Sequence, residues 1–264
     1  MLKLEKNEHV AHVTLNRPEK RNAMTMDFFY EMADLFRQLD KDDSVRVIVV
    51  KGAGDHFTSG LDLADAQKTF GQDKWASARE KIRIKIKELQ DGMNWVEKCR
   101  KPVIAAVHGY CIGGGIDLMS ASDIRLAAKG TVFSIRETRI GIIADVGTLQ
   151  RLPYIIGHGR FRELALTGRD FTAEEALDMG LITHLCQDRD ALYEKADELA
   201  GEIVDLPPLA VQGTKEVINY SRDNGIYPGL DYVAQKNASA VISEDIIEAV
   251  TAFLEKRKPV FKGN

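Results

Sequence analysis

Two continuous apolar runs, each followed by a glycine-containing turn, constrain the fold of this chain most strongly. The runs are VRVIVVK at 45–51 and VIAAVHG at 103–109, and neither alternates between polar and apolar residues. Strands with this composition are typically buried on both faces, as in parallel sheets covered by helices. Strand patterns alternate with helical patterns through the first half of the chain, so the sequence predicts an α/β fold.

The rest of the chain divides into a region of mixed elements and a helical region. The other predicted elements of the first region are a hairpin or two short strands at 2–6 and 9–15, helices after Thr25, near 76–99 and after the glycines at 113–115, and strands at 124–128 and 131–135. The order of the polar segment 62–88 is left open. Beyond about residue 147 the pattern is helical almost throughout, with one long helix at about 231–257. We therefore expect a core at 1–190 and a C-terminal helical region at 191–264.

Charge and hydropathy exclude several classes of protein. The 264 residues carry 36 Lys and Arg against 40 Asp and Glu, a net charge of −4, which argues against nucleic acid or an anionic membrane as the main partner. No apolar stretch reaches the roughly 18 residues that a membrane span needs. The first ten residues lack the features of a signal or transit peptide, so a cytoplasmic enzyme is expected.

Metal and cofactor motifs are also absent from the sequence. Cys99, Cys111 and Cys186 form no C-x-x-C pair, and the histidines are scattered, so no metal site is predicted. The glycines fit neither a dinucleotide-binding spacing nor a P-loop, and Ser59 lies outside any G-x-S-x-G motif. We therefore expect chemistry that uses no metal and no bound cofactor.

Two glycine-containing loops follow the buried strands and are candidates for binding an anion. They are HFTSGLD at 56–62 and HGYCIGGGID at 108–117. A strand, a glycine turn and a helix start leave backbone N–H groups facing a cleft, and the missing Cβ lets a ligand approach closely. One N–H group from each loop would form an oxyanion hole. The alternative interpretation is that both loops are tight turns between packed elements.

Three carboxyl groups, of Asp117, Glu137 and Asp145, are candidates for acid–base chemistry. Asp145 lies in the apolar sequence GIIADVGTL, where burial would raise the pKa of its carboxyl group toward the range useful for proton transfer. Asp117 follows the triple glycine, and Glu137 follows the predicted strand at 131–135. Two structural alternatives stay open. Asp145 is a possible cap of the next helix, and Asp117 a first-turn acid that faces the helix dipole.

Five motifs then occur in a characteristic order along the chain. They are LNRPEKRNAM at 15–24, VIVVKGAGDHFTSGLDL at 47–63, KPVIAAVHGYCIGGGIDL at 101–118, ASDIRLAA at 121–128 and VGTLQRLPYIIG at 146–157. Together they resemble the crotonase superfamily, also called the enoyl-CoA hydratase/isomerase superfamily. The resemblance implies a ClpP-like spiral of ββα units with a C-terminal helical trimerisation region. It also implies an acyl-CoA thioester substrate and an oxyanion hole made by the backbone N–H groups of Leu61 and Gly114.

The spacing of the acids resembles one branch of this superfamily. That branch isomerises 3,5-dienoyl-CoA to 2,4-dienoyl-CoA in unsaturated fatty acid β-oxidation, and its three acids match Asp117, Glu137 and Asp145. The resemblance implies that Glu137 acts at C2 as a base, that Asp145 protonates C6 and that Asp117 orients the other two. Which of Glu137 and Asp145 starts protonated stays open. The alternatives are an enoyl-CoA hydratase, which is a lyase adding water to 2-enoyl-CoA, and a non-catalytic paralogue that binds a CoA ester or RNA.

The same resemblance implies which residues contact the CoA part of the substrate. Arg17, Lys20 and Arg21 are expected near the phosphates, the alternative being solvated basic residues of a loop, and the backbone of Ser59 and Leu63 near the adenine. The family typically forms homotrimers or homohexamers. Three lysines of the C-terminal tail are expected to come from a neighbouring subunit: Lys256, Lys258 and Lys262.

Overall fold

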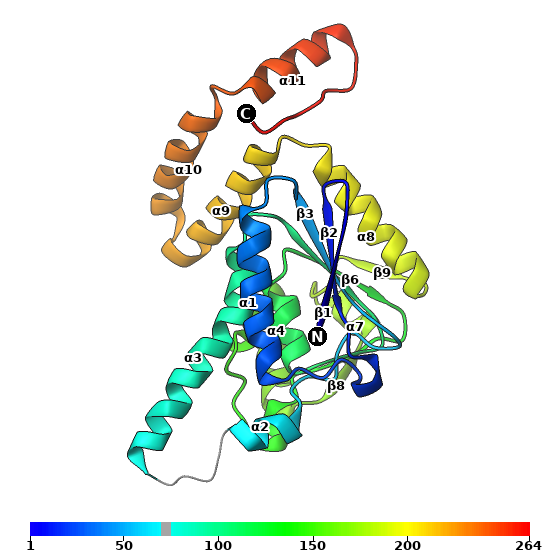
Figure 1. The fold of residues 1–264 in the computed structure, drawn as a ribbon, viewed down its shortest axis with the longest axis vertical. Helices are drawn as coiled ribbons and strands as arrows, with labels where there is room; N and C mark the ends of the chain where they lie inside the picture. The colour runs from blue at the N-terminus through cyan, green and yellow to red at the C-terminus, as the bar shows by residue number, and fades with distance from the viewer. Residues whose placement is uncertain (70–74) are drawn as a thin grey trace.

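The computed structural model describes residues 1–69 and 75–264, and its strands form two sheets (Figure 1). The strands are β1 (Leu2–Asn7), β2 (Val10–Leu15), β3 (Val47–Gly52), β4 (Val103–Val107), β5 (Tyr110–Ile112), β6 (Ile124–Ala128), β7 (Val132–Ser134), β8 (Asp170–Thr172) and β9 (His184–Cys186). The main sheet has the order β1-β2-β3-β4-β6-β9, and the small sheet has the order β5-β7-β8. β1 and β2 pair antiparallel, and the other pairs of the main sheet are parallel. The predicted α/β fold and the N-terminal hairpin are confirmed.

Helices cover the two faces of the main sheet, and the last two extend away from it. They are α1 (Met26–Lys41), α2 (Leu63–Thr69), α3 (Ala76–Lys98), α4 (Gly114–Ala121), α5 (Thr148–Ile156), α6 (His158–Thr167), α7 (Ala173–Asp178), α8 (Arg189–Val204), α9 (Pro208–Asn224), α10 (Ile226–Ala240) and α11 (Glu244–Glu255), with 3-10 helices η1 (Pro18–Lys20) and η2 (Glu137–Ile140). The helix predicted after Thr25 is confirmed as α1. The segment 62–88, whose order the sequence left open, contains α2 and most of α3, and residues 70–74 between them lie outside the described residues.

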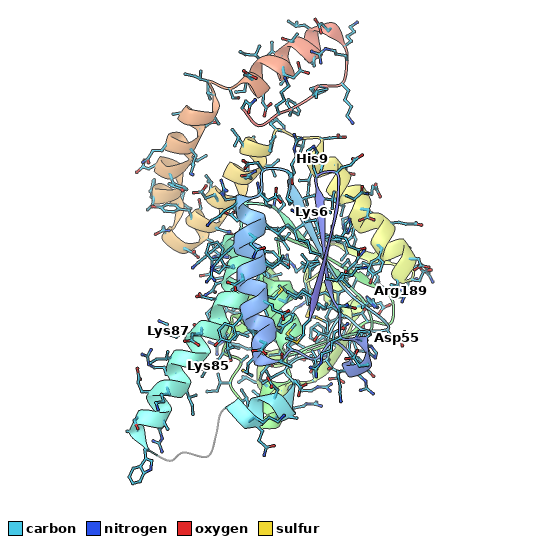
Figure 2. All side chains as sticks on the ribbon, viewed as in Figure 1. Lys6, His9, Asp55, Lys85, Lys87 and Arg189 are labelled. Carbon is cyan, nitrogen blue, oxygen red and sulfur yellow. The ribbon has the colours of Figure 1, made fainter. Side chains whose placement is uncertain are left out.

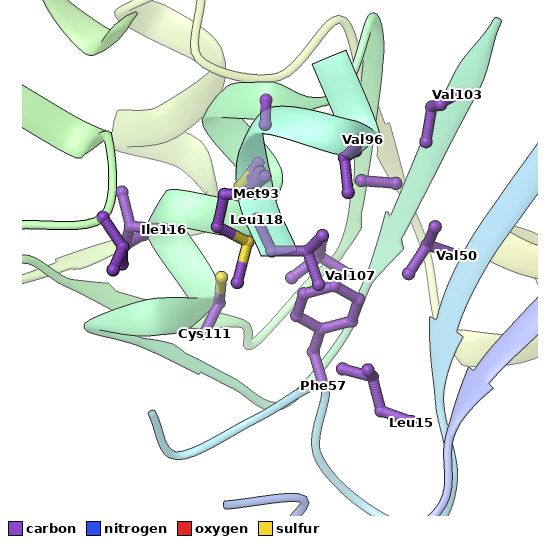
Figure 3. Close-up of a cluster of buried hydrophobic side chains, with 14 of the residues drawn as sticks. Leu15, Val50, Phe57, Met93, Val96, Val103, Val107, Cys111, Ile116 and Leu118 are labelled. Carbon is purple, nitrogen blue, oxygen red and sulfur yellow. The ribbon is translucent and has the colours of Figure 1, made fainter. Parts of the chain in front are cut away.

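Side chains of β3 alternate between two hydrophobic cores, which explains the unbroken apolar sequence of this strand. Ile48 and Val50 belong to a core shared with α1, α3 and α4, whereas Val47 and Val49 belong to a core covered by α8. Figure 3 shows part of the first core, with Phe57 of the loop after β3 among its side chains. A strand between two such layers has no face that contacts water, so the predicted burial of β3 on both faces is confirmed.

One prediction for the second half of the chain is wrong. The helix predicted at about 231–257 is interrupted at residues 241–243, where Ser243 accepts a hydrogen bond from the N–H of Ile246 (3.3 Å) and caps α11. A serine hydroxyl competes for backbone groups in this way, so it favours a new helix start over continuation. The region after residue 147 is helical almost throughout, as predicted. Its strands in the described residues are β8, which pairs with β7 in the small sheet, and β9, which pairs with β6 at the edge of the main sheet.

The C-terminal region contributes one helix to the core and extends away from it with others. α8 packs on the sheet through Leu192, Ala196 and Ala200. α9 is tied to the core by an ion pair between the buried Lys215 and Asp123 (2.7 Å), whereas α10 and α11 project beyond the sheet (Figure 1). The division of the chain at residue 190 stays a prediction. Within the residues described, none of the helices is long and apolar enough to cross a membrane.

Truncation of Phe57 tests whether the first core holds the loop after β3. The Phe57 side chain is fully buried, so Phe57→Ala leaves a cavity and should lower the free energy of unfolding by about 3–5 kcal/mol. Chemical denaturation measures this change. The control Leu166→Ala, on an exposed side chain of α6, should change the free energy by less than about 0.5 kcal/mol. Equal effects of the two variants would contradict the packing described.

Candidate active site

The two glycine loops lie side by side at the carboxyl ends of β3 and β4. The N–H of Thr58 donates to the carbonyl of Tyr110 (2.8 Å), and the N–H of Ile112 donates to the carbonyl of Thr58 (3.2 Å). Gly60 has a φ of +86°, and a Cβ at this position would lie 2.7 Å from the carbonyl oxygen of Ile112. The close approach of the two loops therefore requires glycine at position 60.

Leu61 and Gly114 offer backbone N–H groups at this junction. Met24 pairs with the peptide groups on both sides of Leu61, because its N–H donates to the carbonyl of Gly60 (2.8 Å) and its carbonyl accepts from the N–H of Asp62 (2.8 Å). In such a parallel bridge the N–H of the central residue, here Leu61, points away from Met24. Gly114 opens α4, and the first N–H groups of a helix have no partner within it. Both residues line one cavity, so each loop contributes a candidate donor to it.

This cavity has a volume of about 170 Å³ and is mostly apolar. Its apolar lining comes from helices α1, α2 and α3, from β5 and from the chain between Glu137 and α5: Met26, Phe29, Leu63, Leu89, Ile112, Ile140, Ile142 and Val146. The carboxyl-bearing residues in the lining are Asp117, Glu137 and Asp145. The structure therefore brings the three acids predicted from the sequence into one apolar cavity.

Asp117 is almost completely buried and bonds to the start of α5. Asp117 is only 1% exposed, and its Oδ1 accepts a hydrogen bond from the N–H of Thr148 (2.6 Å). Burial raises the pKa of Asp117 to about 6, and the hydrogen bonds from Thr148 act in the opposite direction. Asp117 does lie in the first turn of α4, as the structural alternative proposed. Its hydrogen bond to Thr148 of α5 is a contact that this alternative did not include.

Glu137 begins η2 and faces the second glycine loop. Burial, followed by the negative charges of Asp117 and Asp145, raises the pKa of Glu137 to about 7. Within the described residues, its Oε2 is buried without a hydrogen-bond partner. A Cβ at Gly113 would lie 3.1 Å from Oε1 of Glu137, so the carboxyl group lies against the glycine loop. A carboxyl group with a pKa near 7 is well suited to transfer protons at neutral pH.

Asp145 does not cap the next helix, so the structural alternative for this residue is wrong. Gly147 is the N-cap of α5, with a φ of +133°. Asp145 lies in the loop between η2 and α5, where Nε2 of Gln90 donates to its carbonyl oxygen (2.7 Å). Burial raises the pKa of the Asp145 carboxyl group. Asp145 therefore holds a proton to a higher pH than a solvated aspartate does.

The residues expected at the CoA moiety fall into two groups. Ser59 and Leu63 line the cavity. The basic residues lie outside its lining: Arg17 forms an ion pair with the aspartate of the first glycine loop (2.8 Å), and Lys20 and Arg21 are exposed. The carbonyl of Arg21 accepts from the N–H of Ser59 (2.9 Å), so the basic loop meets the edge of the cavity.

Two other basic side chains form contacts with residues of the same chain. Arg189, at the start of α8, donates to the carbonyl of Gly54 (3.2 Å), and Figure 2 shows it close to Asp55 in the loop after β3. Lys258 of the C-terminal tail forms an ion pair with Asp205 (2.6 Å). The first contact joins α8 to the loop after β3, and the second joins the C-terminal tail to the end of α8.

Sequence reasoning missed three residues near the acids. Arg136 lines the cavity and is ion-paired with Asp170. Gln90 and Arg151 approach the loop that carries Asp145 from the side opposite the cavity. Gln90 carries no clear sequence signal, because α3 is polar over much of its length. In the part of the chain that is described, no group of three or more His, Cys, Asp or Glu is arranged to hold a metal ion.

Comparison with known proteins identifies the class to which this fold and site belong. A sequence model of the enoyl-CoA hydratase/isomerase family matches residues 5–264, so the chain belongs to that family and is an enzyme of it. A solved structure of an enoyl-CoA hydratase from Bacillus anthracis, 33% identical, has a TM-score of 0.91 and covers 100% of this chain and 99% of its own. The predicted crotonase fold and family membership are confirmed.

Two curated proteins are more similar in sequence. The peroxisomal Δ3,5-Δ2,4-dienoyl-CoA isomerase of Arabidopsis thaliana is 46% identical over 96% of this chain and 92% of its own length. The mitochondrial Δ3,5-Δ2,4-dienoyl-CoA isomerase of Mus musculus is 47% identical over 95% of this chain and 78% of its own length. The resemblance to that branch, inferred from the spacing of the acids, is confirmed.

These comparisons correct one prediction. The cytoplasmic location expected from the sequence is wrong, because the similar proteins are named as peroxisomal in A. thaliana and mitochondrial in M. musculus. That expectation rested on the composition of the first ten residues, and this composition does not decide where a protein of this family works.

The raised pKa of Glu137 predicts a pH-dependent stability. Between its ordinary pKa of 4.5 and its folded pKa of about 7, the folded protein holds a proton that the unfolded chain has released. The stabilisation from this proton is complete below the ordinary pKa and is lost as the pH rises through about 7. Glu137→Gln, which stays uncharged, should therefore have a higher Tm than wild type at about pH 8, and the difference should shrink toward about pH 5.

Thermal unfolding followed by circular dichroism across this pH range measures the difference. The exposed Glu194 of α8 supplies a control, and Glu194→Gln should show no such trend. A Tm difference for Glu137→Gln that is the same at every pH would contradict the raised pKa.

Proposed function

We propose that this protein isomerises 3,5-dienoyl-CoA to 2,4-dienoyl-CoA. The observation that carries the proposal is the shared apolar cavity of Asp117, Glu137 and Asp145, in which burial raises the pKa of each carboxyl group. The reaction needs proton transfer at two carbon atoms of an apolar chain, and two separate carboxyl groups suit that need. The names of the similar proteins from A. thaliana and M. musculus support the same reaction.

The reaction balances with two carboxyl groups and needs no cofactor beyond the CoA thioester itself. Glu137 reacts in its ionised form, which a pKa of about 7 leaves available at neutral pH. It takes a proton from C2, which leaves a dienolate whose charge is spread onto the thioester oxygen. Protonated Asp145 gives a proton to C6, and the double bonds move from the 3,5 to the 2,4 positions. After the product leaves, Glu137 releases its proton to water and Asp145 takes one up, so the starting state is restored.

Backbone donors stabilise the dienolate in this mechanism. The N–H groups of Leu61 and Gly114 bind the thioester oxygen, where the negative charge develops, and each such donor typically contributes about 3 kcal/mol. Asp117 orients the other acids. Its negative charge is one of the causes that raise the pKa of Glu137, and its bond to Thr148 fixes the start of α5.

The proposal also includes the contacts to the CoA moiety and the assembly of the enzyme. The residues proposed to contact CoA are Arg17, Lys20, Arg21, Ser59 and Leu63. Exposed apolar side chains on α10 and α11, such as Tyr227 and Phe253, support assembly into trimers or pairs of trimers through the C-terminal helices. The reaction would serve the degradation of unsaturated fatty acids.

Loss of the Asp145 carboxyl group tests its role as the acid at C6. Asp145→Asn should lower kcat for 3,5-dienoyl-CoA by about 10²–10⁴-fold, because an amide does not protonate carbon, and should leave the fold and CoA binding intact. Steady-state kinetics, circular dichroism and calorimetric titration with a CoA ester measure these effects. Asp178→Asn, on an exposed side chain of α7, is the control. Unchanged turnover in Asp145→Asn would contradict the assigned role.

Isotope labelling separates the isomerase from a hydratase. In D₂O, the product of 3,5-dienoyl-CoA should carry deuterium at C6, because the proton that Asp145 delivers comes from solvent. Mass spectrometry and NMR of the product locate the label. Hydration of 2-enoyl-CoA by the same preparation should be much slower than isomerisation. Faster hydration would favour the activity named for the similar B. anthracis structure, and a product without deuterium at C6 would indicate direct internal transfer.

A further inference from the structure

A second, polar cavity lies behind the loop that carries Asp145. Its volume is about 470 Å³, and its polar lining includes Gln90, Glu97, Arg151 and Arg222. Asp145 and Val146 line this cavity and also the apolar cavity described above. The loop that carries Asp145 is therefore a wall between the two cavities, and polar groups contact that wall from behind.

Gln90 is the residue that reaches the backbone of Asp145 itself. Its Nε2 donates to the carbonyl oxygen of Asp145 at 2.7 Å. The preceding residue, Leu89, lines the apolar cavity. α3 therefore contacts both sides of this wall. The bond to Gln90 matters more here than it would within a helix, because the residues around Asp145 belong to neither a helix nor a strand. The backbone hydrogen bonds of this segment lie at its start, where Gly141 and Ile142 donate to residues of η2.

Arg151 holds the same loop from α5. Its guanidinium lies against the loop backbone, since a Cβ at Gly147 would be 1.8 Å from Nη1. Nη2 donates to Oδ1 of Asn94 (2.8 Å) and to Oε2 of Glu97 (3.1 Å). Arg222 of α9 donates to the other oxygen of Glu97 (2.5 Å). Both oxygens of the Glu97 carboxylate are thus used, and the guanidinium of Arg151 has a fixed position.

We propose that Gln90 is a positioning residue that directs the Asp145 carboxyl group toward C6 of the substrate. This inference rests on the proposed function. The bond to the Asp145 carbonyl fixes the peptide group after Asp145 and with it the direction of the Asp145 side chain, while Arg151 fixes the loop two residues later. A displacement of about 1 Å at a reacting group can lower a rate by about a hundredfold, so the bond acts on turnover rather than on binding.

Gln90→Met tests the proposal, because methionine keeps the length of the side chain and removes its N–H donor. We expect kcat for 3,5-dienoyl-CoA to fall by about ten- to a hundredfold, while KM stays within about twofold and Tm is unchanged. Gln90→Glu should show the same loss at neutral pH, because an ionised carboxylate accepts but does not donate hydrogen bonds. Gln150→Met makes the matched change at an exposed residue lining the same polar cavity and should leave kcat unchanged.

The results for these variants test the role of Gln90, and they can be told apart from a failure of the proposed function. Unchanged kcat in Gln90→Met, wild-type kcat in Gln90→Glu, or an equal loss in Gln150→Met would overturn the role of the Gln90 donor. A loss that is accompanied by a lower Tm and a higher KM would also overturn it, because the defect would then be structural. Failure of the wild-type enzyme to isomerise 3,5-dienoyl-CoA at all would instead contradict the proposed function.

Discussion

The backbone of Gly60 lies against the carbonyl of Ile112 with no room for a Cβ between them. This contact brings the loop after β3 against the loop after β4. Parallel pairing of the two strands places both loops at the same edge of the sheet, and the hydrogen bonds between Thr58 and the second loop join them there. The N–H groups of Leu61 and Gly114 can therefore face one cavity although more than fifty residues separate them in the sequence.

Burial of three carboxyl groups in that cavity lowers the stability of the charged protein, and the surrounding contacts limit the loss. Thr148 offsets part of the cost for Asp117 through a backbone hydrogen bond. The same bond fixes the start of α5, and Arg151 of this helix returns to the loop that carries Asp145. Asp117 thereby fixes the start of α5, and Arg151 of α5 in turn helps to fix the loop that carries Asp145. Such a cluster of buried acids with raised pKa values is typical of sites that transfer protons.

The sequence predicts those strands and helices whose buried apolar residues follow a regular pattern. The strands at 45–51 and 103–109 and the helix after Thr25 follow directly from their apolar patterns. β9, with three residues, is too short to have a pattern, and the helix break at 241–243 depends on one local bond of Ser243. The three acids could be named as candidates from the residues around them, and the family resemblance added a role for each. Gln90 could not, because its role depends on how α3 packs beside a loop 55 residues later.

A crystal structure with an unreactive dienoyl-CoA analogue tests the central claim most directly. The account predicts that the thioester oxygen lies about 3 Å from the backbone nitrogens of Leu61 and Gly114. It also predicts that the Glu137 carboxyl group lies beside C2 and the Asp145 carboxyl group beside C6. An acyl chain outside the apolar cavity, or both carboxyl groups gathered around one water molecule at C3, would contradict it.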